Sequence, residues 1–91
     1  MKHGEVSLYV VTSDSISPQS LQKTIKMYVD CIKKTPEFRL NDSPFTLFWW
    51  DLQVQNITTF RNEIKDFQHN HPYTSVFIMD NSINRIFVKC C

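Results

Sequence analysis

The chain has 91 residues, a formal net charge of +1 and 42% hydrophobic residues, which predicts one small domain with a packed core. Its basic and acidic residues are mixed without a basic stripe, so no nucleic-acid contact is expected. No apolar run approaches the roughly 20 residues that a membrane span needs, and the first residues lack the apolar core of a signal peptide. The chain is therefore expected to be cytosolic or to be part of a longer protein.

The first half of the sequence predicts a strand followed by a helix. Alternating apolar residues indicate a strand over residues 5–12. Ser17 before Pro18 is typical of a helix start, and apolar residues then recur at helical spacing until Pro36, which marks the end of that helix. These apolar residues are Leu21, Ile25, Tyr28, Val29 and Ile32. Residues 37–44 are interpreted as a connection.

The rest of the chain predicts two apolar strands around a second helix, and then a closing hairpin. The strands cover residues 45–52 and 73–79, and Asn56 caps the helix between them. The apolar stripe of this helix is Ile57, Phe60, Ile64 and Phe67. A turn at 80–82 leads to a last strand over 83–91. The order β-α-β-α-β-β predicts an α+β fold, a two-layer sandwich with both helices on one face of a four-stranded sheet.

The strands 45–52 and 73–79 are apolar on both faces. A sheet that helices cover on one side needs apolar residues on that side only. One apolar set is left on an open face, and an exposed patch of that size usually marks a partner or ligand contact. Aromatic side chains are favoured anchors for both. The residues predicted to form this face are Phe48, Trp50, Phe77 and Met79. The alternative is that loops, or the connection 37–44, fold over it.

The three cysteines leave two interpretations open. Cys31 lies on the first predicted helix, and Cys90 and Cys91 end the chain. A bond from Cys31 to one of the terminal pair closes a loop of about 60 residues, which stabilises a domain by ~4 kcal/mol in the chain-entropy model. Three reduced thiols in a cytosolic protein fit the same spacing.

No enzyme, metal or cofactor site is predicted. His69 and His71 lie at a helix end without a thiol or carboxylate cluster and are interpreted as solvated. Cys31 with a histidine and Asp51 could be written as a catalytic set, but a cysteine beside a core stripe is usually structural. The single glycine argues against a glycine-rich phosphate loop.

Two stretches of the chain resemble the periplasmic domain of ToxR-type transcription regulators. Residues 26–34 (KMYVDCIKK) are similar to the helix that carries the first cysteine of that domain. Residues 73–91 are similar to its closing hairpin, which ends in a cysteine. The middle of the chain matches only in the order of elements, and the second terminal cysteine departs from the family pattern. Fimbrial-operon regulators of the PsaE type are another similar branch.

The resemblance implies a sensory domain and not an enzyme. Such proteins are single-pass inner-membrane regulators of virulence or fimbrial genes, with a winged-helix DNA-binding domain inside the cell and a small sensory domain in the periplasm. The resemblance implies that residues 1–91, with an added Met1, are that periplasmic domain. The resemblance implies that a membrane-anchored partner of the ToxS type docks on the domain, and that a bile-acid-like ligand can bind there. It also implies a disulfide from Cys31 to Cys90 or Cys91, with Cys90 favoured.

The alternative function is a free-standing cytosolic adaptor or inhibitor module with a thioredoxin-like or ferredoxin-like fold. A more distant one is a small thiol enzyme that uses Cys31. A count of free thiols separates these functions, because one free thiol supports the periplasmic domain and three support the cytosolic module.

Overall fold

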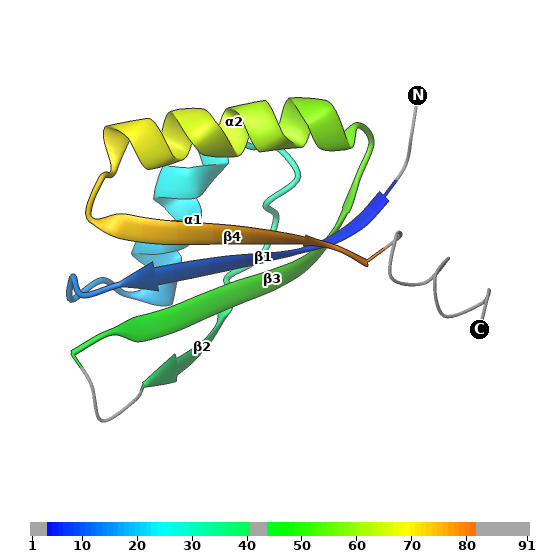
Figure 1. Ribbon diagram of the computed structural model, residues 1–91. Coiled ribbons are helices and arrows are strands. Elements are labelled where there is room, and N and C mark those ends of the chain that lie inside the picture. The colour runs from blue at the N-terminus through cyan, green and yellow to red at the C-terminus, as the bar shows by residue number, and fades with distance from the viewer. Residues whose placement is uncertain (1–3, 41–43, 82–91) are drawn as a thin grey trace.

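The computed structural model describes residues 4–40 and 44–81, and two helices pack on an antiparallel sheet (Figure 1). The elements in chain order are β1 (Gly4–Thr12), α1 (Pro18–Lys26), β2 (Glu37–Leu40), β3 (Thr46–Val54), α2 (Ile57–Asn70) and β4 (Thr74–Asp80). The strand order in the sheet is β2-β3-β1-β4, and every neighbouring pair is antiparallel. The predicted α+β class, with a four-stranded sheet and two helices, is confirmed.

The predicted element order β-α-β-α-β-β is wrong for the described residues, where the order is β-α-β-β-α-β. The additional strand is β2, which lies in the stretch 37–44 that the sequence indicates only as a connection. It pairs with β3 and places Phe38 opposite Phe48. β2 has only four residues, and all of them are exposed. Such a short alternation of charged and apolar residues cannot be distinguished from a loop in the sequence. The last predicted strand, 83–91, lies outside the described residues.

Both helices begin where the sequence predicts. The Ser17 side chain accepts a hydrogen bond from the Ser20 N–H, and the Asn56 side chain accepts one from the Thr59 N–H, each at 3.1 Å. Each cap satisfies a backbone donor that a helix start leaves without an intrahelical partner. The stripe of α2 then reaches the core through Phe60, Ile64 and Phe67.

The first helix ends earlier than its apolar spacing predicts. The helix stops at Lys26, where the N–H groups of Met27 and Tyr28 bond to carbonyls three residues back. Val29 and Ile32 are nevertheless buried, at 1% and 0% exposure. The irregular segment after α1 therefore folds onto the same core, and its buried residues continue the apolar spacing without the helix.

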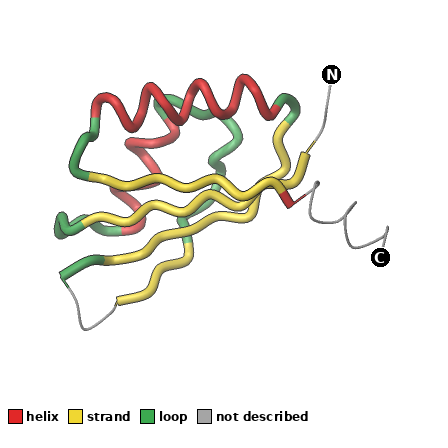
Figure 2. Tube along the Cα trace, in the orientation of Figure 1, coloured by secondary structure: helices red, strands yellow, loops and turns green. Residues whose placement is uncertain are grey.

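The core lies between the two helices and one face of the sheet. Figure 2 shows both helices on the same side of the strands. β1 contributes alternate residues to this core, and Val6, Leu8 and Val10 are fully buried. Trp50 is the largest core side chain, and its indole N–H donates a hydrogen bond of 2.9 Å to the Lys34 carbonyl. This bond satisfies the buried indole and fixes the segment after α1 against the centre of β3.

Candidate functional site

The sheet carries a second apolar face, on the side away from the helices. Tyr9 of β1 lies between Trp49 of β3 and Phe77 of β4, so three aromatic residues form a row across the sheet. We call this surface the open sheet face, and it consists of Tyr9, Val11, Leu47, Trp49, Phe77 and Met79. Phe77 and Met79 are 59% and 47% exposed. In the part of the chain that the structure describes, both helices pack on the opposite face.

The prediction for the open face is wrong for two of its residues. Phe48 and Trp50 are only 1% and 2% exposed and belong to the core under the helices. The antiparallel register explains this placement, because Phe48 lies opposite Val10 and Trp50 lies opposite Leu8, and side chains of directly opposed residues share a face. Phe77 and Met79 do lie on the open sheet face, and their contact with a partner stays a prediction.

One signal in the sequence could have assigned the faces of β3. The strand extends to Val54, two residues beyond the predicted end, so Asp51 and Gln53 are part of it. Both are exposed, and because side chains alternate along a strand they share the face of Trp49. Polar residues on that face mark it as the side away from the core.

A small polar network closes one end of the open sheet face. The Ser7 hydroxyl donates a hydrogen bond of 2.7 Å to the Asp51 carboxylate, and the Asn81 side-chain amide donates one of 2.8 Å to the Ser7 hydroxyl. Ser7 is only 4% exposed. These bonds join β3, β1 and the residue after β4, so they hold together the sheet end at which β4 finishes.

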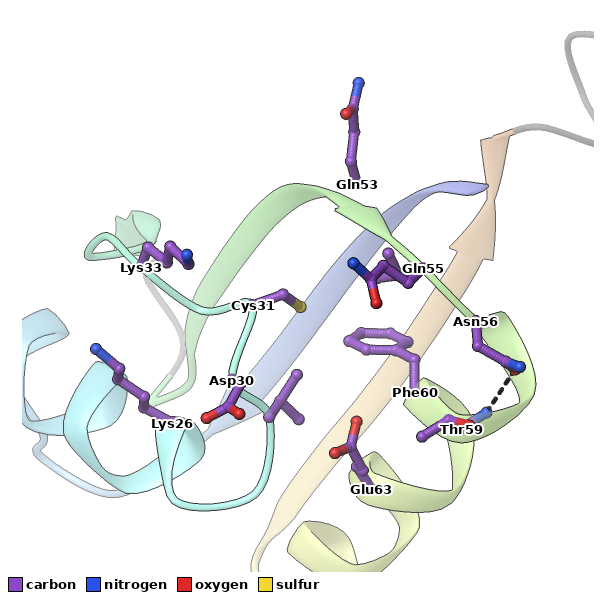
Figure 3. Close-up of a pocket in the computed structure, with 12 residues that line it drawn as sticks. Lys26, Asp30, Cys31, Lys33, Gln53, Gln55, Asn56, Thr59, Phe60 and Glu63 are labelled. Carbon is purple, nitrogen blue, oxygen red and sulfur yellow. Dashed lines mark hydrogen bonds between the residues drawn. The ribbon is translucent and has the colours of Figure 1, made fainter. Parts of the chain in front are cut away.

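A groove of about 1160 Å³ lies on the helix side, between the segment after α1, the end of β3 and the start of α2 (Figure 3). We call it the Cys31 groove. Its apolar lining is Val29, Val54 and Phe60. Its polar lining comes from Lys26, Asp30, Lys33, Gln53, Gln55, Asn56, Thr59 and Glu63. The Cys31 sulfur points into the groove, toward Gln55 and Phe60.

Cys31 is a poor nucleophile in this setting. Burial raises the pKa of its thiol, and the nearby carboxylates of Glu63 and Asp30 raise it further. The pKa of Glu63 is itself raised, by burial and then by the charge of Asp30. Because the thiolate is the reactive form of cysteine, the groove keeps Cys31 as a thiol near neutral pH. It can still form a disulfide with a partner thiol that is held against it.

The residues of the alternative catalytic set are not brought together. Asp51 lies on the open sheet face and bonds to Ser7, whereas Cys31 lies on the helix side. His71 stacks on the Phe67 ring at 4.6 Å, and its Nδ1 lies 3.0 Å from the Phe67 carbonyl. Among the described residues, no group of three or more histidine, cysteine and acidic side chains is arranged to hold a metal ion. His71 is thus a packing residue at the end of α2.

Comparison with known proteins gives no relative. No protein-family model matches the chain, and no curated protein or solved structure is significantly similar to it. Neither of the helices in the described ranges is long and apolar enough to cross a membrane. Function is therefore inferred from the open sheet face, the Cys31 groove and the sequence.

Proposed function

We propose that this is the periplasmic sensory domain of a ToxR-type membrane-anchored transcription regulator, and that a ToxS-type partner domain docks on the open sheet face. The observation that carries the proposal is the exposure of Phe77, which lies in a row of aromatic residues, and of Met79 on the same face. Aromatic residues and methionine are enriched where proteins meet, and a contiguous exposed apolar patch usually marks an interaction site.

The surroundings of the open sheet face also suit a docking surface. Glu37 lies opposite Trp49 and Arg39 opposite Leu47, so β2 places charged side chains along one side of the apolar patch. Asp51 and Ser7 form a polar boundary at one end of the sheet. An apolar centre with a polar rim is the usual organisation of a protein interface, and Trp49 and Tyr9 at the centre are typical anchor residues.

A bile-acid-like ligand fits the same surface chemically. Its rigid apolar ring system would pack on the row of Tyr9, Trp49 and Phe77, while a partner domain covers its other side. The exposed Arg39 on the same face supplies a cation for the ligand's carboxylate. Binding would then stabilise the complex of sensor and partner, because a ligand that binds only the complex shifts the equilibrium toward it.

The finer details of the fold belong to this proposal. A disulfide between Cys31 and Cys90 or Cys91 would connect the segment after α1 to the end of the chain, and Cys31 is a free thiol among the described residues. Disulfides persist in the periplasm and are rare in the cytosol. One reactive thiol in the native protein agrees with the periplasmic domain, whereas three would favour the cytosolic adaptor or inhibitor.

The docking proposal is tested with a matched pair of methionines. Met79 lies on the open sheet face, and Met27 lies at the end of α1 with 81% of its surface exposed. The binding of the partner's periplasmic domain is measured by titration calorimetry for the Met79→Lys and Met27→Lys variants. We expect Met79→Lys to weaken binding about tenfold or more and Met27→Lys to leave the affinity unchanged. Equal affinities for both variants would exclude the open sheet face as the docking site.

A further inference from the structure

The strand β2 forms one border of the sheet. It pairs with β3 on one side, and among the described residues no strand lies on its other side. Figure 1 shows β2 as the outermost strand, on the side of the sheet away from α2. All four of its residues are exposed. The backbone N–H and C=O groups along such an edge are a template for pairing with another strand.

The two faces of β2 carry different kinds of side chain. Glu37 lies opposite Trp49, and Arg39 shares this face because side chains alternate along a strand. Phe38 lies on the helix face opposite Phe48, with the two ring centroids 6.2 Å apart. Phe38 is 50% exposed, in contrast to the 1% of Phe48. The edge thus offers one negative and one positive charge on one face and an exposed ring on the other.

This short sequence is complementary to itself when β2 meets a second copy in the antiparallel direction. A two-fold axis at Phe38 places this residue opposite Phe38 of the second copy. The same axis places each Glu37 opposite an Arg39, so two pairs of opposite charge form at once. The Cβ atoms of directly opposed residues lie about 4.5–5.5 Å apart, and opposite charges and aromatic pairs at these positions both stabilise strand pairing.

The neighbouring two-fold registers bring like charges together. Alternate residues direct their backbone groups to opposite edges of a strand, so the register of a regular antiparallel pair changes in steps of two residues. One step in one direction places Glu37 opposite Glu37 of the second copy, and one step in the other direction places Arg39 opposite Arg39. Like charges directly opposite each other destabilise the pair. Charge therefore selects the register centred on Phe38.

We propose that a second copy of this chain pairs with β2 along its outer edge, so that two sheets join into one continuous antiparallel sheet. The contact is isologous, because both copies use the same strand. The helices of both copies lie on the same side of the joined sheet, since directly opposed residues share a face. The two Phe38 rings then cover each other beside Phe48. A ladder of four residues from each copy buries little surface, so the dimer is weak and reversible.

The test exchanges the charges of β2. Glu37→Arg leaves the strand with two positive residues and Arg39→Glu leaves it with two negative ones, so each variant meets only like charges in its own dimer. Sedimentation equilibrium over a series of protein concentrations measures self-association of the full chain and of both variants. The matched controls are Asp66→Arg and Lys65→Glu, which make the same charge changes at exposed positions of α2. Far-UV circular dichroism confirms that each chain is folded.

We expect the native chain and both controls to dimerise, and each β2 variant alone to associate about tenfold more weakly or less. An equal mixture of the Glu37→Arg and Arg39→Glu chains should associate again, because each strand then faces opposite charges. The double variant that carries both substitutions should also dimerise. The proposal is overturned if the native chain stays monomeric, if the two variants dimerise like the native chain, or if they stay monomeric when they are mixed.

This test is separate from that of the docking proposal. Met79 lies on β4, at the opposite border of the sheet, so Met79→Lys should leave self-association unchanged. Self-association that is lost only in Met79→Lys would assign the contact between copies to the open sheet face and overturn the pairing of β2. The measurements are made without ligand, because a ligand's carboxylate and Glu37 of the second copy would compete for Arg39.

Discussion

The two faces of the sheet are made by the same strands, and both carry large apolar side chains. They differ in whether polar residues lie among those apolar side chains. On the helix side, β1 presents Val6, Leu8 and Val10, all fully buried. On the open side, the apolar residues share their face with Ser7 and Asp51, which bond to each other. The difference teaches that apolar content does not decide which face of a sheet becomes core. The few polar positions do, because a charged or hydroxyl group under a helix needs a partner there.

The adjacent tryptophans give the largest expected contrast between the faces. Trp50→Ala should lower the free energy of unfolding by about 3–5 kcal/mol, because it opens a cavity in the core and removes the donor that satisfies the Lys34 carbonyl. Trp49→Ala should lower it by about 1 kcal/mol or less. Urea unfolding followed by circular dichroism measures both values. Similar losses for the two variants would contradict the assignment of the faces.

Ser7 lies on the same face of the sheet as Trp49, yet it is buried and hydrogen-bonded there. Ser7→Ala should reduce the free energy of unfolding by about 1–2 kcal/mol, because Asp51 loses its donor and Asn81 loses its acceptor. Ser75→Ala, at an exposed serine of the same face, should change it by less than about 0.5 kcal/mol. If the two unfolding curves coincide, the polar network does not hold this end of the sheet.

The cap of α2 tests how much the start of a helix contributes to stability on the covered face of the sheet. Asn56→Ala should lower the free energy of unfolding by about 1 kcal/mol, because the Thr59 N–H loses its acceptor at the start of α2. Asn62→Ala, at an exposed position inside the same helix, should raise it by roughly 0.5 kcal/mol, because alanine favours the helix interior. Opposite signs for the two asparagines are the expected result in thermal unfolding, and a loss in both would contradict the capping role.

The smallest effect is expected from the pH dependence at the Cys31 groove. Burial, and then the Asp30 carboxylate, raise the pKa of Glu63 above its ordinary 4.5. The folded state thus keeps this proton to a higher pH than the unfolded chain does. The stability that Glu63 contributes is full below pH 4.5 and is lost as the pH rises through the folded pKa. Urea midpoints should therefore fall more between about pH 4 and 7 for the native chain than for Glu63→Gln. Parallel profiles would contradict this origin.

Much of the fold can be predicted from local signals in the sequence. Ser17 and Asn56 act as caps because their side chains bond to backbone groups three residues away, which is a purely local property. The strands β1, β3 and β4 follow from runs of apolar residues, to within two residues at each end. The stripe of α2 follows from its helical spacing.

What cannot be predicted depends on contacts far apart in the sequence. The end of α1 at Lys26 could not be predicted, because Val29 and Ile32 continue the apolar spacing although they lie after the helix, in an irregular segment that is buried in the core. The strand β2 exists because β3 offers an edge to it. The face of Trp50 is set by the register with Leu8, and its one local sign is the pair of exposed polar residues, Asp51 and Gln53, on the opposite face of β3. Of the candidate site, Phe77 and Met79 could be found in the sequence, Trp49 could have been assigned from Asp51 and Gln53, and Tyr9 required the register.

Neighbouring tryptophans on opposite faces also give the molecule two separate optical reporters. The indole of Trp50 lies in the core and bonds to Lys34, three residues after Cys31. The indole of Trp49 lies in the centre of the open sheet face. In a Trp49→Phe chain, the remaining emission reports the packing of the core against the segment after α1. In a Trp50→Phe chain, it reports what covers the aromatic row, so events on the two sides of one sheet can be followed independently and without an added dye.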